Sequence, residues 1–231
     1  MSFRKSAPLA LLFIAAATAR AQVVGHTPAS SPYLDLTYSQ EITPIVGYYW
    51  GRGDPAGVAP QSAPLFGLRY EWRAGGPAHL TGEITRIGSQ RLVVDPNKPL
   101  ATRFLGDQSW PVWSADFGLG MSLTGARSWH NLVPMVKAGA GFMSDFKNST
   151  DVGGFKYGTR FALTWGAALR YVPGGRYQFR ADFTNRLTSI RYPDVYFRPT
   201  VNVPPVITGQ DKSVWRNNPA LSIGISYLFS R

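Results

Sequence analysis

Apolar residues alternate with small or polar residues along most of the chain. The clearest example is the segment 221–229, where leucine, isoleucine, tyrosine and phenylalanine occupy the odd positions and serine and glycine occupy most of the even ones. Successive side chains of a β-strand point to opposite faces, so this period of two predicts a strand with one apolar face. No segment beyond the N-terminal region shows a sustained helical stripe, and the pattern therefore predicts an all-β fold.

Four further segments show clear alternation: 66–73, 113–124, 161–171 and 177–184. Weaker alternation extends over 36–50, 78–94 and 132–142. Pro44 lies inside the first of these weaker segments, and because it cannot donate a backbone hydrogen bond, we expect it at a strand start or a bulge. Together the segments predict about eight strands, the smallest number that closes a barrel whose interior side chains can fill.

The connections between these segments alternate in length. Long connections rich in proline, glycine, aspartate and asparagine cover 51–63, 95–110, 144–158 and 190–217, whereas short ones cover 74–77, 125–131 and 173–175. Short periplasmic turns that alternate with longer extracellular loops are typical of a bacterial outer-membrane barrel. We therefore predict a closed antiparallel up-and-down transmembrane β-barrel of about eight strands, located in the outer membrane of a Gram-negative cell.

The residues opposite the apolar set decide which face meets lipid. A soluble barrel would carry a richly charged outer face, whereas here these residues are mostly glycine, serine, threonine and alanine, with a few charges of both signs. That composition suits a narrow polar lumen. The residues that we expect to face lipid include Phe117, Leu119, Leu163, Trp165, Phe179, Ile223 and Ile225.

The isolated charges on the small-residue face predict an ion-pair network inside the barrel, because a buried charge without a partner costs several kcal/mol. The predicted members are Arg69, Glu71, Glu83, Asp116, Lys137, Arg170, Arg180 and Asp182. Aromatic residues at or near strand ends fit the interfacial girdles of membrane proteins; they are Trp72, Trp113, Tyr171, Tyr177, Tyr227 and Phe229.

The N-terminus predicts export. Basic residues at positions 4 and 5, an apolar run over 7–17 and the small-x-small sequence Ala19-Arg20-Ala21 have the three parts of a cleaved signal peptide. We expect a signal peptide over 1–21 and a barrel over 22–231. Removal of its three basic residues lowers the formal charge from +11 to +8. An exported basic protein is expected to meet anionic lipid or glycolipid phosphates and no nucleic acid. Because the chain has no cysteine, disulfides and thiolate metal sites are excluded.

The last strand resembles the assembly signal of outer-membrane barrels through Ser222, Gly224, Tyr227 and Phe229, although Ser230 and Arg231 follow the terminal aromatic. Across nearly all of the mature chain, the layout resembles the small eight-stranded outer-membrane proteins of the OmpA and OmpX type. The resemblance implies a membrane-spanning barrel, commonly without a wide pore, whose loops contact the outside or glycolipid. It also implies barrel-assembly machinery as a partner, and we expect a monomer.

The candidate catalytic residues do not indicate an enzyme. Histidine occurs only at His26, His79 and His130, and all three map to the predicted periplasmic end, away from the outer mouth where barrel enzymes act. Carboxylates of the lumen could run acid/base chemistry if their environments separated their pKa values, but a structural ion-pair network explains them better. We expect no cofactor and no metal, because Asp145, Asn148 and Asp151 are also ordinary loop formers.

These observations predict an integral barrel with a structural, adhesive or ligand-contact role. Four basic residues of the last long connection could meet lipopolysaccharide phosphates: Arg191, Arg198, Lys212 and Arg216. Two alternatives stay open, a lipid A-modifying enzyme of the deacylase or acyltransferase type and a narrow solute channel.

Overall fold

The structure is a computed structural model that describes residues 31–147, 149–199, 203–209 and 211–229. The predicted signal peptide over 1–21, His26 and Asn148 lie outside the described residues. Pro32 to Arg231 form one compact unit, and the description below concerns this unit. Within the described residues, no helix is long and apolar enough to cross a bilayer.

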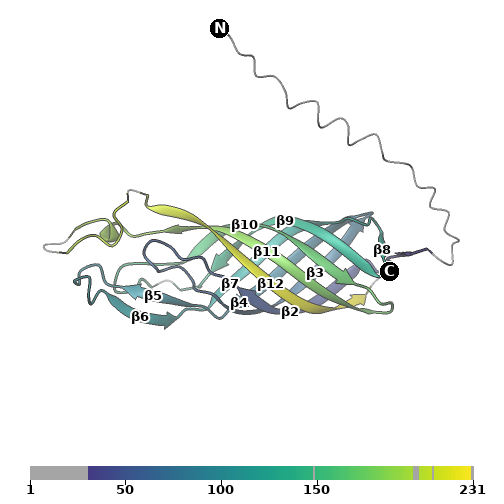
Figure 1. Cartoon of the computed structure of the whole chain (residues 1–231), viewed down its shortest axis with the longest axis horizontal. Coiled ribbons are helices and arrows are strands. Elements are labelled where there is room, and N and C mark those ends of the chain that lie inside the picture. The colour runs from purple at the N-terminus through teal and green to yellow at the C-terminus, as the bar shows by residue number, and fades with distance from the viewer. Residues whose placement is uncertain (1–30, 148, 200–202, 210, 230–231) are drawn as a thin grey trace, which may run out of the picture. The chain divides into compact units, whose positions relative to one another are not determined.

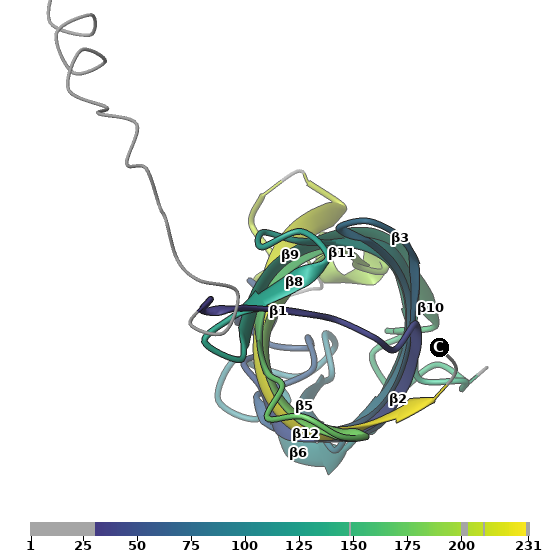
Figure 2. The ribbon, with the colours of Figure 1, turned by 90° about the vertical axis from the view of Figure 1, so that its right-hand side faces the viewer.

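Eight long antiparallel strands of the described chain form a closed ring (Figures 1 and 2). They are β2 (Gln40–Tyr49), β3 (Ala63–Gly75), β4 (Ala78–Ile87), β7 (Val112–Ser122), β9 (Leu132–Ser144), β10 (Thr159–Tyr171), β11 (Tyr177–Arg191) and β12 (Ser213–Phe229). Each pairs with the next one along the chain, and β12 pairs with β2 to close the ring. The predicted fold, an all-β up-and-down barrel, is confirmed.

The barrel has two different ends. At one end, here the loop end, four longer connections join β2 to β3, β4 to β7, β9 to β10 and β11 to β12. At the other end, the turn end, the three remaining connections are shorter. The segment between β1 (Tyr33–Asp35) and β2 crosses the barrel opening at the turn end (Figure 2).

Several strand boundaries differ from the sequence-based expectation. The segment 78–94 is not one strand, because the chain leaves the barrel wall after Ile87 and starts a separate strand β5 (Gln90–Val94). β5 pairs with β6 (Phe104–Ser109), so the expected loop 95–110 contains half of a hairpin. Likewise, the short connection 125–131 contains β8 (Arg127–Trp129), which pairs with β1.

The last two barrel strands extend past their expected ends. β11 continues to Arg191 and β12 starts at Ser213, and the two are in register from Arg191↔Ser213 down to Tyr177↔Tyr227. The segment 190–217 is therefore loop only in its middle part, which contains the short 3-10 helix η2 (Asp194–Tyr196). Pairing with a neighbour stabilises backbone that carries too little local alternation to be recognised as a strand.

Pro44 lies within β2 and not at its start. Its side chain is exposed on the outside of the barrel, and it pairs with Leu68 of β3. On the other side, the register passes from Ile45↔Gly224 to Ile42↔Tyr227, so the ladder with β12 is interrupted beside Pro44. This interruption accommodates a residue that has no N–H to donate.

The loop end contains an apolar core that the alternation alone does not predict. The strands contribute inward-facing residues such as Tyr49, Leu65, Ile87, Val112, Met143 and Ile190. The connections at this end, including β5, contribute Val58, Val94, Trp110, Phe155, Tyr157, Tyr192, Tyr196 and Ile207. The long connections thus fold over the barrel end and close it with a packed apolar layer.

Candidate functional site

All eight predicted lumen charges lie inside the barrel. Their strands, β3, β4, β7, β9, β10 and β11, turn every second side chain inward. Six of the eight residues are buried, and the other two, Asp116 and Lys137, have 10% and 13% side-chain exposure. Three further charged or titratable residues join them: Glu41, His79 and Arg186. These eleven residues are called the lumen network below.

Arg180 is the centre of the part of the lumen network nearest the turn end. Its Nη1 atom lies 2.8 Å from Glu41 Oε1 and 2.7 Å from Glu71 Oε2. Arg170 contacts the same two carboxylates, with Nη1 at 3.2 Å from Glu71 Oε1. His79 Nδ1 lies 2.9 Å from Glu71 Oε1. Two arginines therefore bridge two carboxylates from neighbouring strands across the lumen.

Asp182 connects this cluster to the middle of the barrel. Arg180 Nε donates to Asp182 Oδ2 at 2.8 Å, and Arg69 Nη1 approaches the same oxygen at 2.6 Å. Lys137 Nζ donates to the other oxygen, Oδ1, at 2.9 Å. One carboxylate thus holds three cations that come from three strands.

Arg186 completes the lumen network toward the loop end. Its Nη2 atom donates to Glu83 Oε1 at 2.8 Å, and its Nε atom donates to Asp116 Oδ2 at 2.9 Å. Glu83 also accepts from the guanidinium of Arg69. The ion pairs therefore form one continuous chain from His79 to Asp116.

The lumen network is balanced in charge. Its five carboxylates face four arginines and one lysine, and each of these cations contacts at least one carboxylate. Burial of ions is costly unless they are paired and hydrogen-bonded, and this arrangement satisfies both conditions. Its geometry is that of a structural plug across the lumen.

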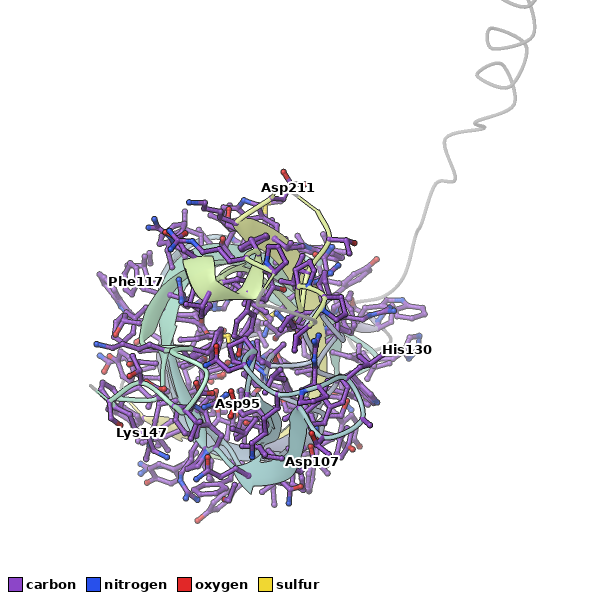
Figure 3. The ribbon with its side chains drawn as sticks, turned by 90° about the vertical axis from the view of Figure 1, so that its left-hand side faces the viewer. Asp95, Asp107, Phe117, His130, Lys147 and Asp211 are labelled. Atoms are coloured by element: carbon purple, nitrogen blue, oxygen red, sulfur yellow. The ribbon has the colours of Figure 1, made fainter. Side chains whose placement is uncertain are left out.

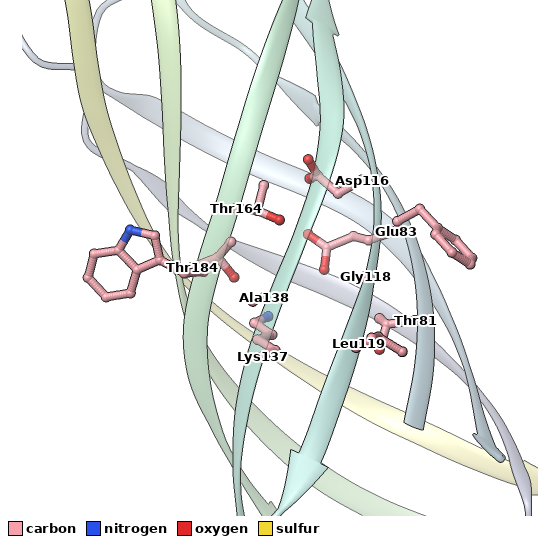
Figure 4. Close-up of a pocket in the computed structure, with 11 residues that line it drawn as sticks. Thr81, Glu83, Asp116, Gly118, Leu119, Lys137, Ala138, Thr164 and Thr184 are labelled. Carbon is pink, nitrogen blue, oxygen red and sulfur yellow. The ribbon is translucent and has the colours of Figure 1, made fainter. Parts of the chain in front are cut away.

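A small cavity lies beside the lumen network, between β4, β7, β9, β10 and β11 (Figure 4). Its volume is about 30 Å³, which is space for one or two water molecules. Glu83, Asp116 and Lys137 line it together with the hydroxyls of three threonines. Gly118 also lines it and pairs with Gly139, where an added Cβ would lie 2.4 Å from the Phe117 carbonyl oxygen.

The residues expected to face lipid lie on the outside of the barrel. All seven are between 44% and 66% exposed, and Phe117 points away from the ring in Figure 3. Of the expected assembly signal, Ser222 is buried on the inner face, and Gly224 is on the same side of β12. Tyr227 and Phe229 lie on the outer face, with ring centroids 6.4 Å apart. Recognition of these residues by assembly machinery stays a prediction.

The loops are held by contacts of their own. Trp110 donates from Nε1 to Asp145 Oδ2 at 2.9 Å. The guanidinium of Arg91 and the ammonium of Lys147 lie over the Trp110 ring, 4.0 and 3.7 Å from its centroid. Asp151 pairs with Arg91 at 2.8 Å. Asp145 and Asp151 thus serve as loop-forming acceptors, and the described residues contain no group of three side chains suited to a metal ion.

The tyrosines of the loop-end core are hydrogen-bonded or buried. Tyr192 Oη donates to Asp54 Oδ2 at 2.8 Å and so joins the last loop to the first. Burial, and then the negative charge of Asp54, raises the pKa of Tyr192 well above its usual range. Burial likewise raises the pKa of Tyr196, with Asp151 adding to the effect.

The basic residues expected to meet lipopolysaccharide phosphates are distributed over the last loop and its flanking strands. Lys212 forms an exposed ion pair with Asp194 at 2.8 Å. Arg191 and Arg198 are exposed, and Arg216 is half-buried. Lys212, and with it Arg198 and Arg191, lower the pKa of Asp194, so three of the four surround this one carboxylate. Contact with lipopolysaccharide stays a prediction.

Glu41 and Arg186 are two network residues that the alternation of side chains could have placed inside the barrel. The inward series Gln178, Arg180, Asp182, Thr184 continues to Arg186, two residues beyond the expected strand end. Glu41 shares the inner face of β2 with Thr43 and Ile45, but its strand is poorly bounded in the sequence. The sequence contains no comparable signal for His79, because nothing in it shows that this residue lies opposite a carboxylate.

No protein-family model matches the sequence, and no curated protein is similar to it. Among solved structures, the outer membrane protein OprG from Pseudomonas aeruginosa is similar with a TM-score of 0.52 at 13% identity, over 85% of this chain and 99% of that one. Neisserial surface protein A has a TM-score of 0.49 at 12% identity, over 82% and 97%. The N-terminal β-barrel domain of Pseudomonas aeruginosa OprF has a TM-score of 0.46 at 14% identity, over 83% and 98%.

The similarity to OprG concerns the fold, which it shares across nearly the whole length of that protein. The exposed apolar band and the polar interior agree with this likeness and are consistent with a location in the bacterial outer membrane. The chain has the fold of the small eight-stranded outer-membrane β-barrels.

Proposed function

We propose that this protein is a non-conducting, non-enzymatic barrel of the outer membrane that presents its loop end to the outside of the cell. The observation that carries the proposal is the filling of the interior. The lumen network occupies the middle and the turn-end half, and the apolar core occupies the loop end. A solute would have to displace both a set of paired ions and a packed core.

The loop end supports a role in contact with the surroundings. Its loops interlock, as shown by the Asp54–Tyr192 contact and by Arg103 Nη2, which donates to the Pro204 carbonyl at 2.7 Å. A scaffold of this kind displays a defined surface and transports nothing. We expect it to act as a monomer in envelope integrity, adhesion or ligand contact, and to be inserted by the barrel-assembly machinery.

Glycolipid is the partner that the outer rim supports best. Arg86 lies on the outer face of β4 near the loop end, with its guanidinium 5.6 Å from the Phe66 ring centroid. Arg191 is exposed at the loop-end terminus of β11. Arginines at this height would meet the phosphates of lipopolysaccharide.

Planar-bilayer recording tests the closed lumen. The purified folded protein is expected to give no discrete current steps under conditions in which a porin in the same membrane does. Reproducible steps would show a solute channel. Mass analysis of lipid A from cells that express the protein addresses the other alternative, and we expect unchanged acyl chains, whereas an added or lost chain would show an enzyme.

The glycolipid contact has its own test. Each arginine near an anionic lipid surface is worth about 1 kcal/mol, or about five-fold in affinity. We therefore expect Arg86→Gln and Arg191→Gln each to weaken lipopolysaccharide binding by about five-fold in a titration of the detergent-solubilised barrel. Arg127→Gln, which removes an exposed arginine near the turn end, is the matched control. Equal loss in all three variants would contradict a loop-end contact.

A further inference from the structure

The outer face of the barrel contains an apolar groove. A groove of about 670 Å³ runs over the outside of β10, β11, β12 and β2 in the half of the barrel near the turn end. Its lining is apolar, with Leu169, Phe179, Ile223 and Ile225 about half exposed.

Small residues create this groove. Leu169, Ala181, Ile223 and Val46 are direct neighbours in one row across four strands. Ala181 is the only small side chain in that row, so it leaves a depression between larger neighbours. Beside it, Gly224 and Pro44 line the groove where the ladder between β12 and β2 is interrupted. The groove thus follows from specific small residues at the seam of the barrel.

A cationic and hydroxylated rim borders the groove at the turn end. Tyr177 and Tyr227 form the next outward pair after Phe179 and Ile225, which is about 7 Å along the strands. Arg176 Nη1 donates to Tyr227 Oη at 3.0 Å. Within the part of the chain that the structure describes, the partners of the Arg176 side chain are the hydroxyls of Tyr227 and Tyr38, and none is a carboxylate.

We propose that this groove binds one acyl chain of a phospholipid of the inner leaflet, with the lipid phosphate at the Arg176 guanidinium and the hydroxyls of Tyr177 and Tyr227. The proposal rests on the orientation given above, in which the turn end faces the periplasm. An acyl chain fits an apolar groove that faces hydrocarbon, and an anionic phosphate complements the arginine at its end. Selectivity comes from packing and from this charge, since the hydrophobic effect does not distinguish a groove from the surrounding lipid.

Native mass spectrometry of the folded, detergent-solubilised protein tests the proposal. The probes are phosphatidylglycerol, phosphatidylcholine and purified lipopolysaccharide, each added alone. The wild type is expected to retain one phosphatidylglycerol, in preference to phosphatidylcholine. Ala181→Trp fills the groove and should lower this occupancy about ten-fold.

The matched control is Ala167→Trp. Ala167 is also exposed on the outer face, on the neighbouring strand β10, but it does not line the groove. This variant should retain lipid as the wild type does. Heat-modifiable migration in gels verifies that each variant is folded, and Ala181→Leu replaces Ala181→Trp if the tryptophan prevents folding.

Arg176→Gln tests the headgroup separately. It should reduce the preference for phosphatidylglycerol over phosphatidylcholine about five-fold while leaving Ala181 and the groove unchanged. Wild-type occupancy in Ala181→Trp, or equal loss in Ala167→Trp, would overturn the groove. Retention of lipopolysaccharide in place of phosphatidylglycerol, sensitive to Ala181→Trp, would overturn the inner-leaflet assignment. A conducting but lipid-selective barrel would refute the proposed closed lumen and leave the groove intact.

Discussion

Replacement of Arg180 by methionine removes the central cation of the lumen network while it keeps an unbranched apolar stem. Arg180 contacts three carboxylates, those of Glu41, Glu71 and Asp182, at 2.7–2.8 Å. Its loss leaves the interior with five carboxylates and four cations. One negative charge is then buried without compensation.

The cost follows from what each carboxylate keeps. Glu41 and Glu71 retain Arg170, and Asp182 retains Arg69 and Lys137. Removal of one partner of a buried ion pair typically costs about 3–5 kcal/mol. Because every carboxylate keeps a partner, we expect a loss near the lower limit, about 3 kcal/mol in the free energy of unfolding.

Urea unfolding of the protein in lipid bilayers, followed by tryptophan fluorescence and gel migration, measures this loss. Arg127→Met is the matched control, since Arg127 pairs with Asp35 at 2.9 Å but is 62% exposed. We expect that control to cost less than about 1 kcal/mol. In Arg180→Met, the additional change Glu41→Gln restores charge balance and should recover part of the loss. Equal effects of the two single variants, or no recovery in the double variant, would refute the account of the lumen.

Three further outcomes follow from the structure. Gly139→Ala should destabilise the barrel by about 1–3 kcal/mol in the same unfolding assay, because the added Cβ would lie 2.4 Å from a carbonyl oxygen across the strand pair. Gly82→Ala is the control: its Cβ would meet nothing within 4 Å, and it should cost less than half as much. Trp110→Ala should cost about 3–5 kcal/mol and expose the loops to limited proteolysis; unchanged cleavage would contradict the interlocked loop end. The raised pKa values of Tyr192 and Tyr196 mean that the unfolded chain releases these protons at lower pH than the folded one. Stability should therefore fall as pH rises above about 10, and the part of the tyrosinate absorbance that Tyr192→Phe and Tyr196→Phe remove should appear only as the protein unfolds.

The alternation of residues predicted the fold because the barrel uses it directly. In β10 and β11, apolar and polar side chains separate onto two faces over most of the strand, so strand, face and barrel class follow from the sequence. The first and last residues of the strands follow less well from the sequence. Ser213 to Asn217 became strand only because β11 lies beside them, and that neighbour is not visible in the local sequence.

The pairing of charges depends on geometry that no local pattern contains. The sequence predicts that Arg180 and Glu71 lie inside, but their contact joins β11 to β3 across the lumen, 109 residues apart. It depends on strand register and on the diameter of the ring. The apolar core at the loop end could not be predicted for the same reason, since Trp110 and Phe155 belong to loops whose paths tertiary contacts decide.

The orientation of the strand faces is the central claim, and β12 offers a direct test of it. Ile223 is 58% exposed and its neighbour Ser222 is 6% exposed. Because the chain has no cysteine, Ile223→Cys and Ser222→Cys can each carry a single nitroxide label for electron paramagnetic resonance in bilayers. We predict high oxygen accessibility, typical of lipid, at 223 and low accessibility at 222; the reverse order would contradict a barrel with its charges inside.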